Sequence, residues 1–143
     1  MSKGTEGHFD TLPIGRLGLI PLNSSAALGK KVDDYLVSWR KGRGNEFAEK
    51  YVAAYEGYER DSYIIQSQVP RFGSGEAKGI INESVRGDDI YVMVDVTNYS
   101  LSYPIGPYTN LMSPDDHFQD MKRVIAAVGG KARRVNVIMP YLY

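Results

Sequence analysis

The nearly continuous apolar run at residues 90–96 (I-Y-V-M-V-D-V) constrains the fold of this chain more than any other stretch. A strand covered on both faces shows such a run, whereas a strand with one wet face alternates. A helix signature follows the run, and a second strand-like run occupies residues 135–139 (V-N-V-I-M). Strand, helix and strand in this order make a crossover unit, which we expect to be parallel and right-handed. The pattern predicts an α/β fold.

The helix between these two runs has a clear start and end. Ser113 can cap its N-terminus, and Pro114 suits the first helical position. Asp115 and Asp116 fall in the first turn, where acidic side chains interact favourably with the helix dipole. Glycines at positions 129 and 130 end the helix. Its apolar face consists of Phe118, Met121, Val124, Ile125 and Val128.

A second strand and helix are expected near the start of the chain. Residues 17–22 (L-G-L-I-P-L) form a short apolar run, and residues 23–25 (N-S-S) then offer oxygens that can cap a helix. Three- and four-residue spacing gives the helix one apolar face, so we expect an amphipathic helix. The residues of that face are Leu28, Val32, Tyr35, Leu36 and Trp39, and Gly42 and Gly44 end the helix.

The next segments predict a further helix, a hairpin and a long connection. We expect a helix capped by Asn45, with a tyrosine-rich stripe along one face. Packing in the core or in an interface is favoured for this stripe over stacking on bases or sugars. Strands at 62–69 and 77–81 would flank an exposed turn at 72–76. Residues 98–113, rich in proline, glycine and tyrosine, are expected to be a connection without regular structure. The tyrosine-rich stripe of the helix after Asn45 consists of Phe47, Tyr51, Ala54, Tyr55 and Tyr58.

These elements predict a three-layer α/β/α domain with a mostly parallel sheet and a protruding β-hairpin. The length of 143 residues suits one domain, which we place at residues 14–143 after a flexible N-terminus at residues 1–13. Ligands of open α/β sheets gather at the carboxyl ends of the strands. Because the chain stops directly after a strand, we expect it to be a fragment of a longer protein.

Composition excludes several kinds of site. Seventeen basic and seventeen acidic residues balance, so the chain shows no electrostatic footprint for nucleic acid. The absence of cysteine excludes disulfides, thiolate zinc sites and thiol catalysis. There is no signal-peptide pattern, and no apolar run approaches the roughly 18 residues that span a bilayer. We therefore expect a soluble, cytoplasmic protein without a membrane partner.

Most catalytic patterns are also missing. The glycines at 73, 75 and 79 have the wrong spacing for a dinucleotide loop, and a strand-like segment rather than a helix follows them. His8 has no second ligand at metal-binding spacing. Residues 115–117 (D-D-H) could hold a metal, but helix capping is the favoured explanation for the two aspartates. We predict no metal site and find no signature of a catalytic triad or carboxylate pair.

The segment at residues 83–87 (E-S-V-R-G) indicates an anion-binding turn. Ser84 offers a hydroxyl and Arg86 a guanidinium, and both can donate to one phosphate or sulfate. A capped turn with a surface arginine explains the same residues equally well. The residues themselves leave the two interpretations open.

Several segments resemble ribose-phosphate pyrophosphokinases, also called phosphoribosyl pyrophosphate synthetases. Residues 83–92 (E-S-V-R-G-D-D-I-Y-V) are similar to their E-S-V-R-G-x-D-V-Y segment. Residues 19–28 resemble their first strand, Ser-Ser turn and helix. Phe72-x-x-x-Glu76 is similar to their Phe-x-Asn/Asp-x-Glu hairpin tip, and residues 135–143 resemble the strand that ends in Ile-Pro-Tyr. The resemblance covers most of the chain in two blocks.

The resemblance implies a function. Members of this family transfer pyrophosphate from ATP to ribose 5-phosphate with magnesium, and their two phosphoribosyltransferase-type domains assemble into dimers and hexamers. This chain resembles the N-terminal domain only, with the second domain absent, and a homo-oligomer is expected. Phe72 would stack on adenine, while Ser74 and Glu76 would contact its edge from a neighbouring subunit. Ser84 and Arg86 would match a regulatory site for phosphate or ADP.

Departures from the family pattern limit that expectation. Ser74 replaces the usual Asn or Asp, and the stretches at 42–62 and 98–113 are longer than the family's connections. The Arg-Gln-Asp loop, the magnesium histidine and the loops of the second domain are missing, so the chain alone is expected to be inactive. The alternatives are a non-catalytic regulatory or nucleotide-sensing relative that binds the enzyme, and an α/β module whose similarity is only structural.

Overall fold

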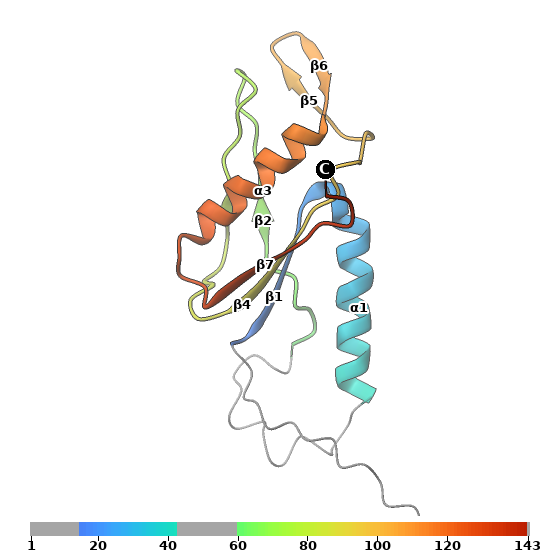
Figure 1. The fold of residues 1–143 in the computed structure, drawn as a ribbon, viewed down its shortest axis with the longest axis vertical. Helices are drawn as coiled ribbons and strands as arrows, with labels where there is room; N and C mark the ends of the chain where they lie inside the picture. Colours follow the sequence, from blue (N-terminus) through green and yellow to red (C-terminus); the bar gives the residue numbers. More distant parts are fainter. Residues whose placement is uncertain (1–14, 43–59, 143) are drawn as a thin grey trace, which may run out of the picture.

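A parallel sheet forms the centre of the molecule (Figure 1). The structure, a computed structural model, describes residues 15–42 and 60–142. Its sheet has the order β1-β4-β7, with β1 at Leu17–Pro21, β4 at Asp89–Met93 and β7 at Arg134–Ile138. Both neighbours run parallel to β4. The predicted α/β class and the parallel direction of the crossover are therefore confirmed.

Some predicted features lie outside the described residues. They are the flexible N-terminus at 1–13, His8, and the tyrosine-rich helix after Asn45 with its stripe of Phe47, Tyr51, Ala54, Tyr55 and Tyr58.

Strand β4 is central because its side chains are covered on both faces. Ile90 and Val92 are fully buried, and Val94 just beyond the strand is too. Close packing continues at β1, where a Cβ on Gly18 would lie 2.3 Å from the Ile65 side chain. The apolar run that predicted a doubly covered strand thus forms the middle of the core.

The segment predicted as one strand at 62–69 divides into two parts. Its first part runs parallel to β1: Leu19 N–H donates to the Tyr63 carbonyl at 2.8 Å, and Ile65 N–H donates to the Leu19 carbonyl at 2.7 Å. Its second part is β2 (Ser67–Gln68), which pairs antiparallel with β3 (Ile80–Ile81). One segment therefore pairs first with the parallel sheet and then, as β2, with β3 on the way to the turn at 72–76.

Helix α3 (Pro114–Val128) begins and ends as the sequence predicts. The Ser113 hydroxyl accepts from the backbone N–H of Asp116, and the Asp116 carboxylate accepts from the backbone N–H of Ser113, which completes a capping box. Gly129 closes the helix in the left-handed conformation at φ 60°. The buried face also includes His117 and Asp120, which the apolar pattern did not indicate.

The apolar face predicted for the first helix lies largely at the surface. That helix, α1 (Ala26–Gly42), leaves Leu28 43%, Tyr35 61% and Trp39 55% exposed. Its buried residues are Gly29 and Asp33. A Cβ on Gly29 would lie 2.3 Å from the Pro21 side chain. Close backbone approach at a glycine therefore decided which side of α1 faces the sheet.

Asp33 also fixes the orientation of α1. Its carboxylate accepts from the backbone N–H of Tyr63 at 2.6 Å and from the Ser62 hydroxyl at 2.8 Å. A buried carboxylate needs such partners, because removing it from water without hydrogen bonds is costly. Helical periodicity contains no information about these distant donors.

The predicted capping role of residues 23–25 was wrong. These residues form a short 3-10 helix (η1, Asn23–Ser25), and no side chain caps it. The Ser25 hydroxyl instead donates to the Met93 carbonyl at 2.7 Å, while the Ser24 hydroxyl accepts from the backbone N–H of Asp95 at 3.1 Å. The two serines link the carboxyl ends of β1 and β4, so their hydroxyls are engaged there rather than in capping a helix.

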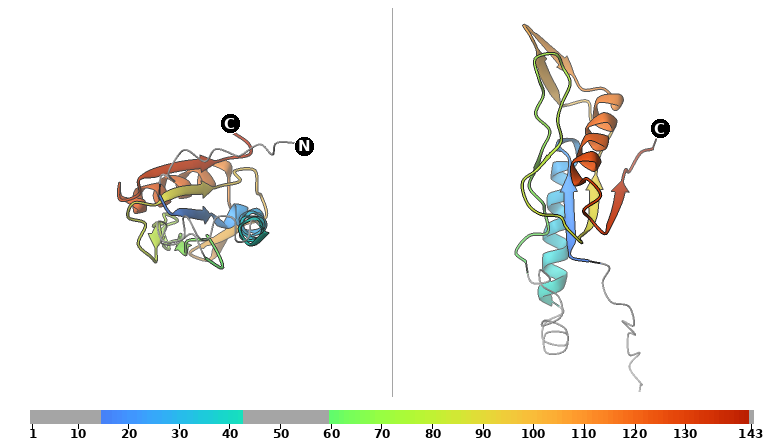
Figure 2. Two further views of the ribbon diagram at one scale, coloured as in Figure 1. Left: turned by 90° about the horizontal axis from the view of Figure 1, so that it is seen from below. Right: turned by 90° about the vertical axis from the view of Figure 1, so that its left-hand side faces the viewer.

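The predicted connection at 98–113 contains a second antiparallel pair, β5 (Ser102–Ile105) and β6 (Tyr108–Leu111). Gly106, at φ 55°, lies in the turn between them. This hairpin and the segment around residues 70–77 extend together beyond one end of the sheet (Figures 1 and 2). The β-forming residues on either side of Gly106-Pro107 are the local hairpin signal in this stretch.

Candidate functional site

The turn predicted to bind a base is closed by its own backbone. Phe72 N–H donates to the Glu76 carbonyl at 2.8 Å, and Gly75 N–H donates to the Phe72 carbonyl at 2.9 Å. Gly75 has φ 98°, which a residue with a side chain rarely adopts. Arg71 and Ala77 pair across the base of this loop. We call residues 72–76 the tip.

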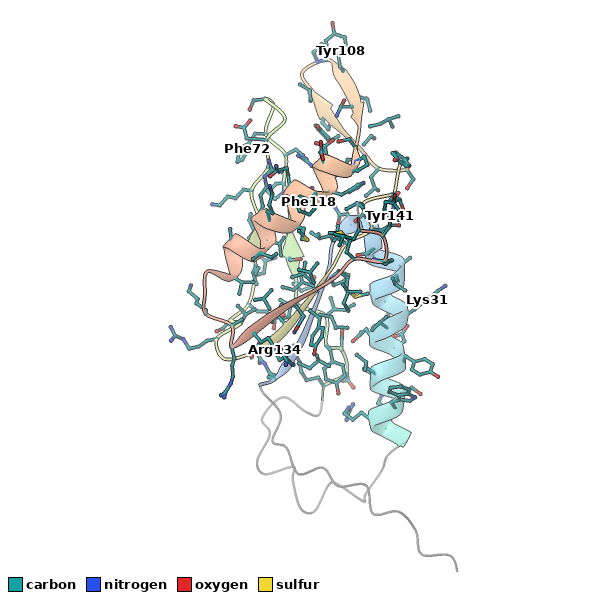
Figure 3. All side chains as sticks on the ribbon, viewed as in Figure 1. Lys31, Phe72, Tyr108, Phe118, Arg134 and Tyr141 are labelled. Carbon is teal, nitrogen blue, oxygen red and sulfur yellow. The ribbon has the colours of Figure 1, made fainter. Side chains whose placement is uncertain are left out.

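The structure brings the three residues predicted for ATP together on the tip. Phe72 is 49% exposed and lies on the turn that extends from the molecule (Figure 3). Ser74 and Glu76 are also exposed. The Ser74 hydroxyl donates to the Glu76 carboxylate. This hydrogen bond lowers the pKa of Glu76 below its ordinary value, and a backbone hydrogen bond adds to the effect. The tip thus presents an aromatic face beside an oriented carboxylate that accepts hydrogen bonds.

The predicted anion turn lies elsewhere, directly before β4. Ser84 and Arg86 are exposed, while Val85 between them is buried. Gly87 follows at φ 77°. Because Val85 points inward, the side chains on either side of it are directed toward solvent.

Arg16, the residue before β1, fixes this turn. Its guanidinium donates to the Ser84 carbonyl at 2.9 Å and to the Asp88 carboxylate at 2.8 Å. The Asp88 side chain is only 4% exposed. An arginine that satisfies a buried carboxylate and a backbone carbonyl together holds the loop in one conformation.

Two basic residues that sequence reasoning missed lie beside the same turn. Gly87 N–H donates to the Lys131 carbonyl, and Arg133 N–H donates to the Asp88 carbonyl, both at 2.9 Å. The side chains of Lys131 and Arg133 are exposed, as is that of Arg86. Among the described residues, none of these three cations lies within ion-pairing distance of a carboxylate. The K-A-R-R run at 131–134 was the available signal.

The neighbouring arginine of that run has a structural role. Arg134 donates to both carboxylate oxygens of Asp89, at 2.8 and 2.5 Å. The hydrogen bond to Asp89 is the main cause of the raised pKa of Arg134. We therefore restrict the anion cluster to Ser84, Arg86, Lys131 and Arg133.

The tip and the anion cluster lie at opposite ends of α3. Arg71, at the base of the tip, contacts Asp116 and Asp120 in the first two turns of the helix. The anion cluster includes Lys131, just beyond the last turn, whose carbonyl accepts from Gly87 N–H. Fifteen helical residues separate these ends by about 22 Å at 1.5 Å per residue. The structure keeps the two candidate sites apart.

A cleft of about 320 Å³ opens at the carboxyl end of β1, beneath the tip. This is the sheet edge at which ligands of α/β proteins commonly bind. Burial raises the pKa of Asp120 in its wall, and the charges of Arg71 and Arg123 oppose that rise only in part. His117 is also buried, with its Nε2 2.7 Å from the Asn98 carbonyl oxygen. No sequence pattern had indicated this cleft.

The described residues supply no metal-binding group of three His, Asp or Glu side chains. In the D-D-H segment at 115–117, Asp116 completes the capping box and His117 bonds to the Asn98 carbonyl. In the part of the chain that the structure covers, no helix is long and apolar enough to cross a bilayer.

The segments that form the sheet, the tip and the E-S-V-R-G turn all fall within a family match. A family model for the N-terminal domain of ribose phosphate pyrophosphokinase matches residues 17–143. The chain belongs to this family. The match includes β1, the tip, the anion cluster and β7, so the resemblance seen in the sequence is confirmed as family membership. Among curated proteins, no match was found.

Proposed function

We propose that this chain is the N-terminal domain of a ribose-phosphate diphosphokinase and contributes base contacts to ATP and contacts between subunits. The full enzyme would transfer pyrophosphate from ATP to ribose 5-phosphate in nucleotide biosynthesis. The observation that carries the proposal is the half-exposed Phe72 ring beside the Ser74–Glu76 pair on one closed turn. The parallel sheet is consistent with a three-layer, phosphoribosyltransferase-type domain from which this turn protrudes.

The tip chemistry suits a purine with an exocyclic amine. An aromatic face binds a base by stacking, while a carboxylate accepts hydrogen bonds from the amine. In place of Asn or Asp, Ser74 acts by donating to Glu76 and thereby orienting it. An exposed tip provides one side of a site, so the remaining contacts would come from a neighbouring subunit.

The anion cluster suits regulatory phosphate or ADP. Ser84 offers a neutral donor, and Arg86, Lys131 and Arg133 offer cations without a carboxylate partner among the described residues. Free cations around a fixed turn favour a phosphate more than a surface arginine alone would. This grouping favours the anion interpretation that the sequence left open.

Magnesium would accompany ATP as its complex and assist transfer by neutralising phosphate charge. The described residues contain no cluster that fits the ion, so we assign none of them to magnesium. We also assign no catalytic residue, and expect the chain alone to be inactive with ATP, magnesium and ribose 5-phosphate.

Subunit assembly is supported by the apolar residues left at the surface. The exposed side of α1 carries a shallow groove lined by Lys31, Val32, Tyr35, Leu36 and Trp39. Along β7, Val135 and Val137 are also exposed. Large apolar patches of this kind mark interaction surfaces.

Substitution on the tip tests the ATP assignment. Phe72→Ala and Glu76→Ala should each weaken Mg-ATP binding in the assembled oligomer, measured by titration calorimetry. Stacking worth about 1–3 kcal/mol per base corresponds to about a 5- to 150-fold rise in Kd. Tyr99→Ala, which also removes an exposed aromatic ring, is the control and should leave Kd unchanged. Wild-type affinity in both tip variants would refute the assignment.

A separate pair of variants tests the anion cluster. Arg86→Ala and Lys131→Ala should reduce binding of phosphate and the response to ADP while leaving the affinity for Mg-ATP at the tip unchanged. Lys122→Ala removes an exposed lysine from α3 and serves as the control. A normal phosphate response in both cluster variants would favour the simpler interpretation, a capped turn with surface cations.

The alternative is a non-catalytic relative that senses nucleotide and binds the enzyme. The observation in favour of this alternative is that Ser74 stands where the family has Asn or Asp, on a tip that otherwise follows the family pattern. Such a protein would bind Mg-ATP but would add no product-forming activity to the assembly. An assay of the full-length protein with ATP, magnesium and ribose 5-phosphate separates the two, because only the enzyme forms phosphoribosyl pyrophosphate.

A further inference from the structure

Arg71 directly precedes Phe72, yet its side chain is directed into the molecule rather than toward a ligand. Only 10% of that side chain is exposed. The β2–β3 ladder below the tip consists of two residue pairs, and two-stranded hairpins are marginally stable on their own. The tip therefore needs an anchor outside its own strands, and Arg71 lies where such an anchor would act.

The guanidinium joins the tip to α3. Its Nη1 donates to the Gly75 carbonyl in the tip at 3.2 Å, and its Nη2 donates to the Asp120 carboxylate at 2.9 Å. Asp116, one turn earlier on α3, lies 3.9 Å from Nη1. A planar guanidinium can satisfy two partners in fixed directions, which an ammonium on a flexible stem cannot.

The same group joins the tip to the β5–β6 hairpin. The Arg71 guanidinium carbon lies 4.3 Å from the centre of the Tyr103 ring, and the Tyr103 hydroxyl donates to Asp116 at 3.0 Å. The tip also rests on β5, because a Cβ on Gly75 would lie 3.3 Å from the Ile105 side chain. Tip, α3 and β5 thus meet at one largely buried cation.

We propose that Arg71 is a positioning residue that holds the tip in the geometry for base binding, with Tyr103 of the β5–β6 hairpin as part of this support. The inference rests on the proposed role of Phe72 and Glu76. It assigns a function to the inserted hairpin: β5 supplies the wall against which the base-binding turn is fixed. Arg71 itself touches no nucleotide.

Arg71→Met tests the proposal, because methionine keeps an apolar stem and removes the guanidinium group. Hydrogen exchange at the amides of Phe72 and Gly75, which close the tip, should accelerate about tenfold. In the assembled oligomer the Kd for Mg-ATP should rise about tenfold, whereas phosphate binding at the anion cluster should remain unchanged. Arg71→Lys retains the charge but cannot span both partners, so it should not restore either property.

Arg40→Met is the matched control. Arg40 is a partly buried arginine of α1, and its guanidinium donates to a backbone carbonyl outside the tip, that of Arg60, at 2.9 Å. It should therefore leave tip exchange and ATP affinity unchanged. Tyr103→Phe keeps the ring and removes only its hydroxyl, so it should give a smaller change in the same direction as Arg71→Met.

Each other outcome overturns the proposal. Faster tip exchange with unchanged ATP affinity would show that the fixed geometry is irrelevant to binding. Weaker ATP binding with unchanged exchange would show that Arg71 acts directly on the ligand. Equal loss at the tip and at the anion cluster in Arg71→Met and Arg71→Lys would show general damage to the fold. If Phe72→Ala retains wild-type ATP affinity, the proposed function fails instead, while the exchange result still decides whether Arg71 fixes the tip.

Discussion

Asp116 contacts three different partners at the N-terminus of α3. Its carboxylate accepts from the backbone N–H of Ser113 at 2.9 Å, from the Ser113 hydroxyl at 2.8 Å and from the Tyr103 hydroxyl at 3.0 Å. Burial alone would raise the pKa of Asp116, but these hydrogen bonds and the charge of Arg71 outweigh it and leave the pKa below its ordinary value. One residue thus caps a helix and supports the β5–β6 hairpin.

The lowered pKa predicts a pH-dependent contribution to stability. Because the pKa of Asp116 is lower in the folded than in the unfolded chain, its ionised form stabilises the fold above the ordinary value of 3.8. This contribution is lost as pH falls through the folded pKa. Asp116→Asn should be less stable than the wild type at neutral pH, and the difference should shrink in acid. Urea unfolding at a series of pH values measures it, and a difference independent of pH would contradict the explanation.

At the scale of elements, close approach between backbones decides how the segment between the tip and β3 packs against α3. A Cβ on Gly79 would lie 2.4 Å from the carbonyl oxygen of Arg123 and 2.6 Å from its carbonyl carbon. Real Cβ atoms do not approach a backbone so closely. The contact between the segment leading into β3 and helix α3 therefore depends on the absence of a side chain at this position.

Gly79→Ala should separate these two elements. We expect a loss of about 1–3 kcal/mol in the free energy of unfolding, as for other overpacked sites, measured by chemical denaturation. Gly73→Ala is the matched control, since nothing lies within 4 Å of a Cβ there. It should change stability by less than about 0.5 kcal/mol. Equal effects at the two glycines would show that backbone entropy, rather than the contact with α3, matters.

At the scale of the whole molecule, the described residues share one core around β4, and the two candidate sites lie beyond it in opposite directions (Figures 1 and 2). The tip and the β5–β6 hairpin extend past the carboxyl end of the sheet. The anion cluster lies at the other end, where the loop after α3 enters β7. A change at one site can therefore leave the other intact, which the proposed experiments use.

The position of β4 between β1 and β7 predicts unequal costs for the same substitution. Ile90 on β4 is fully buried, whereas Ile138 at the end of β7 is 38% exposed. Ile90→Ala should cost about 2–5 kcal/mol, the range for large-to-small changes in a core. Ile138→Ala should cost less than half as much. Comparable losses in the midpoints of denaturant unfolding would mean that β7 is covered in solution, for example by another subunit.

Much of this architecture could be predicted from local signals. The apolar run at 90–96 predicted a doubly covered strand because both faces of β4 pack on other elements. Ser113, Pro114 and Gly129 predicted the limits of α3 because helix ends need nearby groups to satisfy the free backbone donors and acceptors. The E-S-V-R-G segment predicted the family for a different reason, since it is a recognisable motif rather than a folding signal.

Local patterns were insufficient where a distant partner decided the packing. The apolar stripe of α1 faces outward because Gly29 allows close contact with Pro21 and Asp33 reaches donors at residues 62 and 63. Ser25 bonds to the Met93 carbonyl instead of capping a helix. The hairpin β5–β6 was missed because its short strands follow a proline- and glycine-rich pattern that equally suits an irregular loop.

The sequence by itself determined the α/β class, the central strand, the capped helix α3 and the residues of the tip, because each depends on neighbours along the chain. Only the tertiary structure decided that Lys131 and Arg133 lie beside Ser84 and Arg86, and that the side chain preceding Phe72 is fixed between α3 and β5. Those groupings join residues that are tens of positions apart. Hydrogen bonds and close packing between such residues arise only once the chain has folded, so local sequence patterns contain no record of them.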